Sequence, residues 1–311
     1  CIRDRHITVL TAKGSAQIYA RHPAINRLVL FDHARLKQLS LRSPGALAAL
    51  FADTLAELNE REYELAFDLQ GLARTVIFLY RVRARRKFVK GRWPGLEGFR
   101  NKQLHAIDEM SAVLEVAGIP VNDISMRFYR PPETREQLGG ALAGYGLVEL
   151  LDRPAGAGYV VISPFTRWSS KNWPLENFIE LAAALAGEYS VLITGTEGDR
   201  GAITSQLSGD MPGVYNLAGE LNLAQLAELM SGARLVISGD SFPMHLAAAV
   251  QVPLVALFGP TDERKTGPRT QHSHVLRPDD CAMCDKPECP RACLEQIPVS
   301  RVAQAALGLL Q

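Results

Sequence analysis

The stretch SGDSFPMHLAAAVQVPLVALFGPTD spans residues 238–262 and contains the pattern from which the fold can be predicted. An apolar strand over residues 234–238 leads into a small polar turn, which precedes a predicted helix over residues 241–250 and a second apolar strand over residues 253–259. Apolar strands that alternate with helices are typical of a parallel sheet covered on both faces. Ligands of such sheets bind at the carboxyl ends of the strands, where this polar turn stands.

The same alternation extends in both directions along the chain. The expected strands cover residues 6–12, 27–32, 63–69, 86–90, 159–164, 190–195 and 213–219. The expected helices cover residues 44–61, 103–117, 175–187, a segment from about 199, 223–231 and 298–310, whereas residues 91–102 read as a long loop. Pro, Gly and Ala interrupt the pattern at residues 150–158. We therefore predict two α/β domains, residues 1–152 and 153–311.

Composition narrows the class of protein. The chain has 311 residues, of which 47% are hydrophobic and 22% charged, which is typical of a folded protein with a large core. The formal net charge of +1 argues against nucleic-acid binding by bulk electrostatics. No apolar run approaches the roughly 18 residues of a membrane span. Four of the five cysteines fall in one short run, which is not the pattern of a secreted disulfide scaffold and favours a cytoplasmic location.

The polar turn has the features of an anion site. Ser241 is a good helix N-cap, and Pro243 suits the first helical turn, where its missing N–H costs nothing. The free amides and the positive end of the helix dipole attract negative charge. His245 lies four residues after Ser241 and hence on the same helical face. In isolation, this turn is better explained as a capped helix whose histidine packs against a neighbouring strand.

Two further loops follow strand ends in the same predicted sheet. The first loop, residues 163–174, offers Thr166, Arg167 and Lys171, a set that suits a diphosphate. The second loop, residues 194–199, contains Glu197, which could accept hydrogen bonds from sugar hydroxyls. Because three such loops meet at one edge of one sheet, we expect a site for a nucleotide diphosphate there.

The motifs SPFTRWSSKNWPLENFIEL, ITGTEGDR and LAGELNLAQLAELMSGARLVISGDSFPMHLAAAVQVPLVALFGPTD, with the closing cysteine run, resemble the heptosyltransferases of glycosyltransferase family 9. The resemblance covers residues 158–311. In the first half, FDLQGLARTVIF (residues 67–78) resembles the segment near the acceptor site of heptosyltransferase I. The resemblance implies a GT-B fold, in which two Rossmann-like parallel-sheet domains have a cleft between them.

Site residues follow from the resemblance position by position. Lys171 would neutralise the donor diphosphate with help from Thr166 and Arg167, Glu197 would hold the ribose, and Leu221 would lie near the base. Asp240, Ser241 and Phe242 would meet the donor with His245 beside them, and Lys171 and Asp240 are the expected catalytic residues. The expected acceptor-binding residues are Asp68, Gln70, Gly71 and Arg74. Phe242 replaces a glycine that the family often has, and Arg74 replaces a lysine.

The implied reaction moves heptose from ADP-heptose, with inversion, to the inner-core keto-sugar acid of a lipopolysaccharide precursor anchored by lipid A, and it requires no metal. The family's general base is an acidic residue in a turn that has no counterpart before His6, so we expect the base upstream of this chain. Basic side chains of the first half would bind the acidic acceptor, or they would form a solvated face or contact anionic lipid at the inner face of the cytoplasmic membrane: Arg74, Arg81, Arg83, Arg85, Arg86, Lys87, Lys90, Arg92, Arg100 and Lys102.

The cysteine run, Cys281, Cys284, Cys289 and Cys293, has a spacing that could close around a structural zinc ion or an iron–sulfur cluster. Reduced structural thiols or local disulfides are the alternatives. Other functions also remain open at this point. They are transfer by a family 9 enzyme with another nucleotide sugar or acceptor, nucleotide-sugar binding without catalysis, and a metal or redox role of the cysteines.

Overall fold

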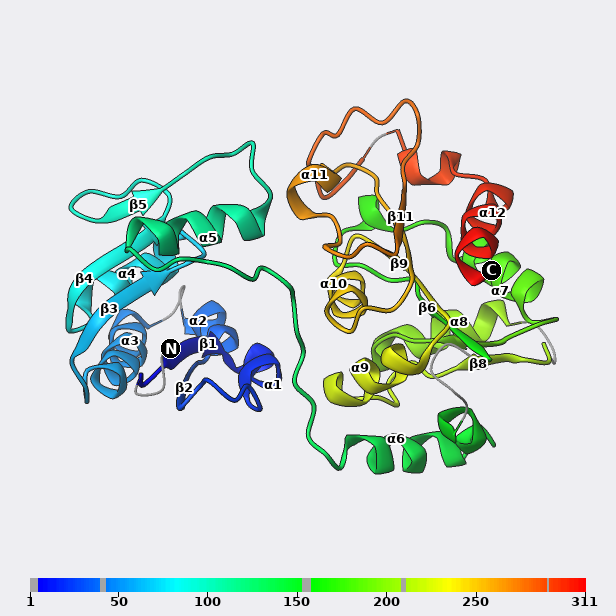
Figure 1. The fold of residues 1–311 in the computed structure, drawn as a ribbon, viewed down its shortest axis with the longest axis horizontal. Helices are drawn as coiled ribbons and strands as arrows, with labels where there is room; N and C mark the ends of the chain where they lie inside the picture. Colours follow the sequence, from blue (N-terminus) through cyan, green and yellow to red (C-terminus); the bar gives the residue numbers. More distant parts are fainter. Residues whose placement is uncertain (1–4, 40–42, 153–157, 208–210, 290) are drawn as a thin grey trace. The chain divides into compact units, whose positions relative to one another are not determined.

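The computed structural model describes residues 5–39, 43–152, 158–207, 211–289 and 291–311 (Figure 1). Cys1 and residues 153–157 of the predicted linker lie outside the described residues. The chain divides into two compact units, Cys1–Ile124 and Ser125–Gln311. None of the helices in the described ranges combines the length and the apolar character that a bilayer crossing requires.

The first unit contains two small parallel sheets. Strands β1 (Thr8–Ala12) and β2 (Arg27–Phe31) form one of them. Strands β3 (Tyr63–Asp68), β4 (Ala84–Lys90) and β5 (Glu97–Phe99) form the other. The short strand β5 lies in the segment that was predicted to be a loop. The helices of this unit are α1 (Ala16–Tyr19), α2 (His33–Leu39), α3 (Pro44–Leu58), α4 (Ala73–Arg81) and α5 (Ala106–Val116).

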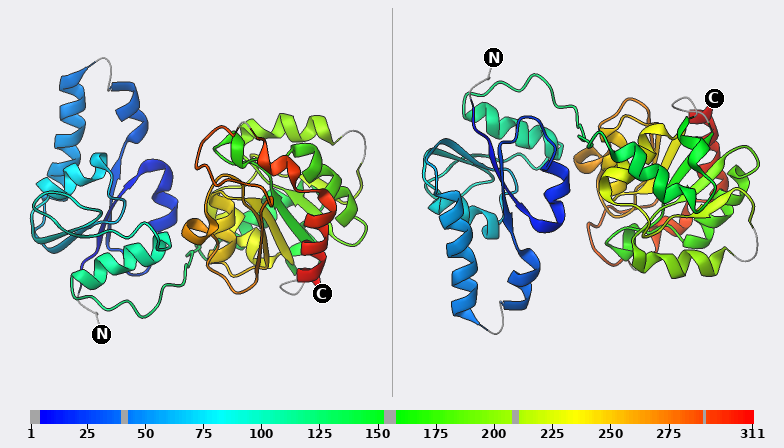
Figure 2. Two further views of the ribbon diagram at one scale, coloured as in Figure 1. Left: turned by 90° about the horizontal axis from the view of Figure 1, so that it is seen from above. Right: turned by 90° about the horizontal axis from the view of Figure 1, so that it is seen from below.

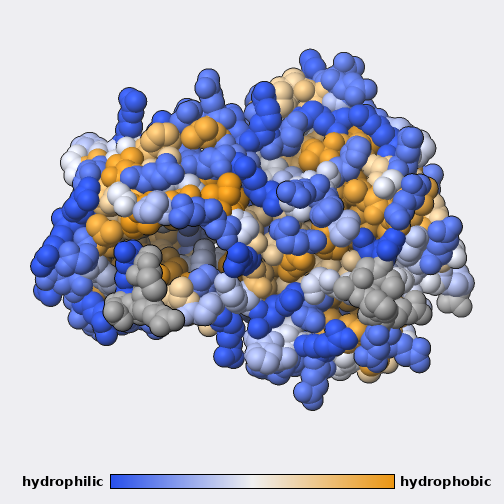
Figure 3. Space-filling model, viewed as in Figure 1, coloured by the Kyte–Doolittle hydropathy of each residue, from blue (hydrophilic) through white to orange (hydrophobic). Residues whose placement is uncertain are grey.

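Three aromatic rings join the strands and helices of the first unit. Phe31 of β2, Phe51 of α3 and Phe78 of α4 have ring centroids 5.1–5.3 Å apart. Each such pair contributes about 0.5–1.5 kcal/mol beyond the burial of its area. Helix α4 also exposes apolar side chains, since Ile77 and Tyr80 are 45% and 40% accessible. Figure 3 shows apolar patches among the polar side chains of the molecular surface.

The second unit contains one parallel sheet with the strand order β11-β10-β9-β6-β7-β8 (Figures 1 and 2). Its strands are β6 (Tyr159–Ser163), β7 (Ser190–Ile193), β8 (Val214–Asn216), β9 (Leu235–Gly239), β10 (Leu254–Leu257) and β11 (Ser273–Leu276). Its helices are α6 (Thr134–Ala143), α7 (Leu175–Leu185), α8 (Arg200–Gln206), α9 (Leu223–Gly232), α10 (Phe242–Ala249), α11 (Glu263–Thr266) and α12 (Val299–Leu310).

Helices cover both faces of this sheet, as the continuous apolar runs predict. Successive strand residues point to opposite faces. Val160 and Ile162 of β6 belong to a core cluster with α7, α8 and α12. Tyr159 and Val161 of the same strand belong to a second cluster with α6, α9 and α10. Because each strand is buried on both sides, a polar residue is tolerated mainly at its end, where the site residues stand.

The division between the units differs from the predicted boundary at residue 152. Residues 125–152 belong to the second unit because α6 has an apolar face that packs against α9. Leu138 and Leu142 of α6 are completely buried in the second cluster. Arg130 also forms an ion pair with Glu228 of α9 at 3.0 Å. The predicted first domain therefore has to be shortened to end at Ile124.

Candidate functional site

Two loops of the second unit meet where the strand order reverses. Counted from β6, the order runs through β7 and β8 on one side and through β9, β10 and β11 on the other. Connections on opposite sides of such a point diverge, and doubly wound sheets bind their ligands at the carboxyl ends of the strands beside it, which here are β6 and β9. The loop after β6 contributes Lys171, and the turn after β9 contributes Asp240. The structure thus brings both expected catalytic residues together at the switch point of the sheet.

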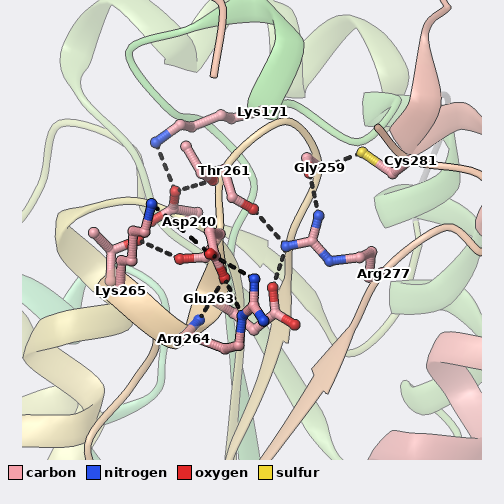
Figure 4. Close-up of polar contacts among 11 residues, drawn as sticks. Lys171, Asp240, Gly259, Thr261, Glu263, Arg264, Lys265, Arg277 and Cys281 are labelled. Carbon is pink, nitrogen blue, oxygen red and sulfur yellow. Dashed lines mark hydrogen bonds and ion pairs between the residues drawn. The ribbon is translucent and has the colours of Figure 1, made fainter. Parts of the chain in front are cut away.

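Lys171 and Asp240 form a buried ion pair at this point (Figure 4). The distance from Lys171 Nζ to Asp240 Oδ2 is 2.6 Å, and the two side chains are 16% and 5% exposed. Thr261 Oγ1 donates a second hydrogen bond to the same carboxylate oxygen at 2.6 Å. The Lys171 ammonium also lies 4.6 Å from the centre of the Trp168 ring. A largely desolvated ammonium with a fixed direction is suited to bind an anion from solvent.

The loop after β6 holds Lys171 through its own backbone. Asn172 Oδ1 accepts a hydrogen bond from Thr166 N at 2.8 Å, and Thr166 Oγ1 donates to the carbonyl of Trp168 at 2.8 Å. The loop packs directly on the end of β9, since a Cβ at Gly239 would lie 2.9 Å from Thr166 Cγ2. Thr166 therefore shapes the loop, whereas the side chain of Arg167 is exposed to solvent.

Helix α10 begins at the predicted position. Ser241 is its N-cap, but its hydroxyl makes no capping bond to the helix and lies 3.4 Å from the carbonyl oxygen of Gly239. The first amides of the helix are therefore not occupied by this cap. Phe242 is 42% exposed beside them, and His245 is half-buried one residue after Met244.

The remaining expected donor residues lie at the ends of β7 and β8. Glu197 is exposed and packs over Gly219, where a Cβ would come within 2.0 Å of Glu197 Oε2. The positive φ of Gly219, +81°, also disfavours any other residue at that position. Leu221 is half-buried and packs against the second core cluster. These side chains stand at the same edge of the sheet as the ion pair.

The expected acceptor residues lie together in the first unit, at the carboxyl end of β3. Asp68 Oδ1 accepts hydrogen bonds from the backbone amides of Gln70 and Gly71 at 2.8 and 2.9 Å, while Oδ2 is buried and has no partner among the described residues. Gly71 has a φ of +67° and approaches the carbonyl of Lys90 so closely that a Cβ would lie 1.8 Å from it. Asp68 and Gly71 therefore build the turn, and Gln70 and Arg74 are exposed on it.

Several basic side chains of the first unit are paired with acids. Arg86 makes a bidentate contact with Glu97 at 3.2 and 3.0 Å. Arg85 pairs with Glu64 at 3.2 Å, and Lys90 pairs with Glu109 at 3.5 Å. The positive charge that was assigned to acceptor or lipid binding is thus partly neutralised within the unit.

The cysteine segment packs beside the site. Cys289 Sγ and Cys293 Sγ are 3.6 Å apart, and all four thiols of the run are free. Backbone amides, that of Arg291 first, lower the pKa of the Cys289 thiol, whereas burial raises the pKa of Cys293 to about 12. Within the described ranges, no group of three or more His, Cys, Asp or Glu side chains is arranged to hold a metal ion, so the structural zinc stays a prediction. Ser169 and Ser170 line a hollow of about 500 Å³ together with residues of this segment, among them Lys286 and Cys289.

Thr261 is the site residue that the motifs did not single out. It is 7% exposed and follows β10 in the sequence Gly259-Pro260-Thr261-Asp262. The rule that strand ends carry the site could have identified it, because β10 is the neighbour of β9 in the sheet.

Comparison with known proteins agrees with this architecture. Residues 54–295 match Glycosyltransferase family 9 (heptosyltransferase). The chain is 28% identical over 303 residues to lipopolysaccharide heptosyltransferase 1 of Pseudomonas aeruginosa, with 89% of this chain and 77% of that protein covered.

Two solved structures have a similar fold. A glycosyl transferase of family 9 from Veillonella parvula gives a TM-score of 0.81 at 22% identity, with 98% of this chain and 88% of that chain covered. The E. coli heptosyltransferase WaaC with ADP gives a TM-score of 0.74 at 21% identity, with 99% and 91% covered. Since the family match covers most of the chain and both units have parallel sheets with helices, the protein is a glycosyltransferase of family 9, the heptosyltransferases, with the two Rossmann-like domains of the GT-B fold.

Proposed function

We propose that this enzyme transfers heptose from ADP-heptose to the inner-core keto-sugar acid of a lipopolysaccharide precursor, with inversion at the anomeric carbon. Membership of the family and the name of the Pseudomonas relative support heptose transfer in lipopolysaccharide synthesis. The observation that supports binding of a nucleotide-sugar donor is the buried Lys171–Asp240 pair, which lies at the switch point of the sheet in the second unit. A fixed cation at that position is suited to a leaving group that carries two phosphates.

The proposed reaction is a single displacement. The acceptor hydroxyl loses its proton to a general base, and its oxygen attacks the anomeric carbon of the heptose. The bond between that carbon and the β-phosphate oxygen breaks, and its electron pair stays on the departing ADP. Negative charge therefore grows on the diphosphate, where Lys171 and the positive N-terminal end of the α10 dipole would oppose it.

Burial makes this arrangement effective. The Lys171 side chain is 16% exposed, so water screens its charge less than that of a surface lysine. Asp240 and the Trp168 ring keep the ammonium oriented before the donor arrives, which avoids reorganisation during the reaction. Glu197 would accept hydrogen bonds from the ribose and Leu221 would contact the adenine.

The acceptor would bind to the first unit through the Asp68 turn, where Gln70 and Arg74 are exposed. The acceptor is anchored by lipid A, so we place the reaction at the inner face of the cytoplasmic membrane. Exposed cations of the first unit that are not paired as above, such as Arg92, would contact its anionic groups.

A transfer assay with the full-length protein tests this proposal. It would measure ADP release from ADP-heptose in the presence of a heptose-free lipopolysaccharide acceptor. Lys171→Ala should lower kcat/KM by about 100-fold or more, the usual effect of removing one group that stabilises developing charge. The matched control is Lys265→Ala, because Lys265 is 49% exposed and its ion pair with Asp262 is long, at 4.0 Å. We expect the control to stay within about threefold of the wild type.

The alternatives predict different results. Turnover with another nucleotide sugar, but not with ADP-heptose, would assign a different donor to the same site. Tight ADP binding without turnover of any sugar would favour a binding protein. Full activity of Lys171→Ala would contradict the role given to the ion pair.

A further inference from the structure

Arg277 supports the site from outside the loops that the motifs identify. It follows β11 directly, and its side chain is 17% exposed. Its Nη1 donates to the carbonyl of Gly259 at 2.7 Å, and its Nη2 contacts the carbonyl of Thr261 and the carboxylate of Glu263. Figure 4 shows the guanidinium between these groups. One planar group therefore binds both ends of the turn that leaves β10.

This turn connects directly to the ion pair. Thr261 donates its hydroxyl to Asp240 Oδ2 at 2.6 Å, and Lys171 Nζ contacts the same oxygen at 2.6 Å. The order of contacts is thus Arg277, the carbonyls of the turn, Thr261, Asp240 and Lys171. Every contact in this series is either charge-assisted or made by a buried group. Water therefore cannot easily replace a lost contact, and a displaced side chain at one end should displace the next one.

The cysteine segment holds the same turn from another side. Cys281 Sγ donates to the carbonyl of Gly259 at 3.0 Å, and Asp285 N donates to the carbonyl of Pro260 at 2.8 Å. The segment also accepts two hydrogen bonds from Ser170, by its amide and by its hydroxyl. The turns that precede Lys171 and contain Thr261 are therefore braced against one another.

We propose that Thr261 and Arg277 are positioning residues for the donor diphosphate, acting through Asp240 and Lys171. Asp240 needs a second hydrogen-bond donor, because Lys171 has to share its ammonium with the phosphates once the nucleotide sugar binds. The hydroxyl of Thr261 is that hydrogen-bond donor. It holds the Asp240 carboxylate in place, so that N–H groups of the Lys171 ammonium can turn to the phosphates. Arg277 keeps Thr261 in place, since its rigid planar fork holds two carbonyls of one turn in a fixed geometry, which the flexible ammonium of a lysine does not impose. This inference rests on the proposed function.

Calorimetric binding of ADP to the whole protein tests the inference without requiring turnover. Thr261→Val removes the hydroxyl and preserves the shape, and it should weaken ADP binding about fivefold. Thr261→Ser keeps the hydroxyl and should bind ADP within about twofold of the wild type. Arg277→Lys should weaken binding by a similar factor to Thr261→Val. Arg264→Lys is its matched control, because Arg264 is 74% exposed and pairs with the neighbouring carboxylate of Asp262. This control should leave ADP binding unchanged.

A double variant separates positioning from a general structural effect. If Thr261 acts through Lys171, then Thr261→Val should change ADP binding less than twofold when Lys171→Ala is already present. Independent fivefold losses in both backgrounds would overturn the inference, as would a Thr261→Ser variant as weak as Thr261→Val. A wild type that binds ADP with this pattern but transfers no heptose would refute the proposed reaction and leave the positioning intact. A wild type that does not bind ADP would overturn both.

Discussion

The strongest stability prediction concerns the unequal roles of the two partners in the Lys171–Asp240 pair. Replacing Lys171 with Met keeps the aliphatic stem but leaves the Asp240 carboxylate, which is 5% exposed, with Thr261 as its remaining side-chain donor. Removing one partner of a fully buried pair costs about 3–5 kcal/mol. Because Lys171 is itself 16% exposed, we expect the lower end, about 3 kcal/mol.

The converse substitution should cost less. Asp240→Asn leaves an ammonium on a flexible stem that can turn toward solvent, so we expect a loss of about 1–2 kcal/mol. The double variant Lys171→Met/Asp240→Asn buries no unpaired charge and should lose less than the sum of the two single variants. The resulting coupling free energy should be about 2 kcal/mol, within the range of residues in direct contact.

Urea unfolding followed by tryptophan fluorescence would measure these values. Trp168 lies against Lys171 and Trp173 is 2% exposed in the same unit, so both rings report on the second unit. In a thermal scan, a loss of 3 kcal/mol in a unit of this size corresponds to about 6–12 °C in Tm. Lys265→Met is the control and should change stability by less than about 0.5 kcal/mol. The reasoning is refuted if the two substitutions add within about 0.5 kcal/mol, or if Asp240→Asn is the more costly one.

Two other predictions concern the Asp68 turn and the cysteine segment. Gly71→Ala should destabilise the first unit by more than about 3 kcal/mol in thermal unfolding, because the new Cβ would clash with the Lys90 carbonyl. Gly118→Ala is the control: its φ is +82°, but no atom lies within 4 Å of the new Cβ, so it should cost only about 1–2 kcal/mol. Equal losses for the two variants would contradict this reasoning. Cys289 should react with iodoacetamide well before Cys293 at neutral pH, because its pKa is lowered and that of Cys293 is raised, and its rate should rise with pH only up to its lowered pKa. Peptide mass spectrometry of the alkylated protein would detect the order, and faster labelling of Cys293 would show that the amides do not stabilise the Cys289 thiolate.

The first half of the chain shows where local patterns stop being informative. Strand β5 has three residues and lies among glycines and charges, so periodicity could not distinguish it from a loop. The domain boundary was misplaced for a related reason. Helix α6 was not among the predicted helices, and only its contact with α9 assigns it to the second unit.

The sequence alone determined most strands and helices of the second unit and the residue types at their ends, although α6, α11 and β11 were not predicted. Long apolar runs predict strands buried on both faces, and polar residues can interrupt such strands only where they leave the core, so local patterns were enough to mark Lys171, Asp240 and Glu197 as candidate site residues. The folded structure was needed to show which strand ends are neighbours. Lys171 and Asp240 are 69 positions apart, and they meet because β6 pairs with β9, a choice made by the packing of whole helices on the sheet. The same choice sets Thr261 against Asp240 and Arg277 against its turn, contacts that no spacing in the sequence encodes.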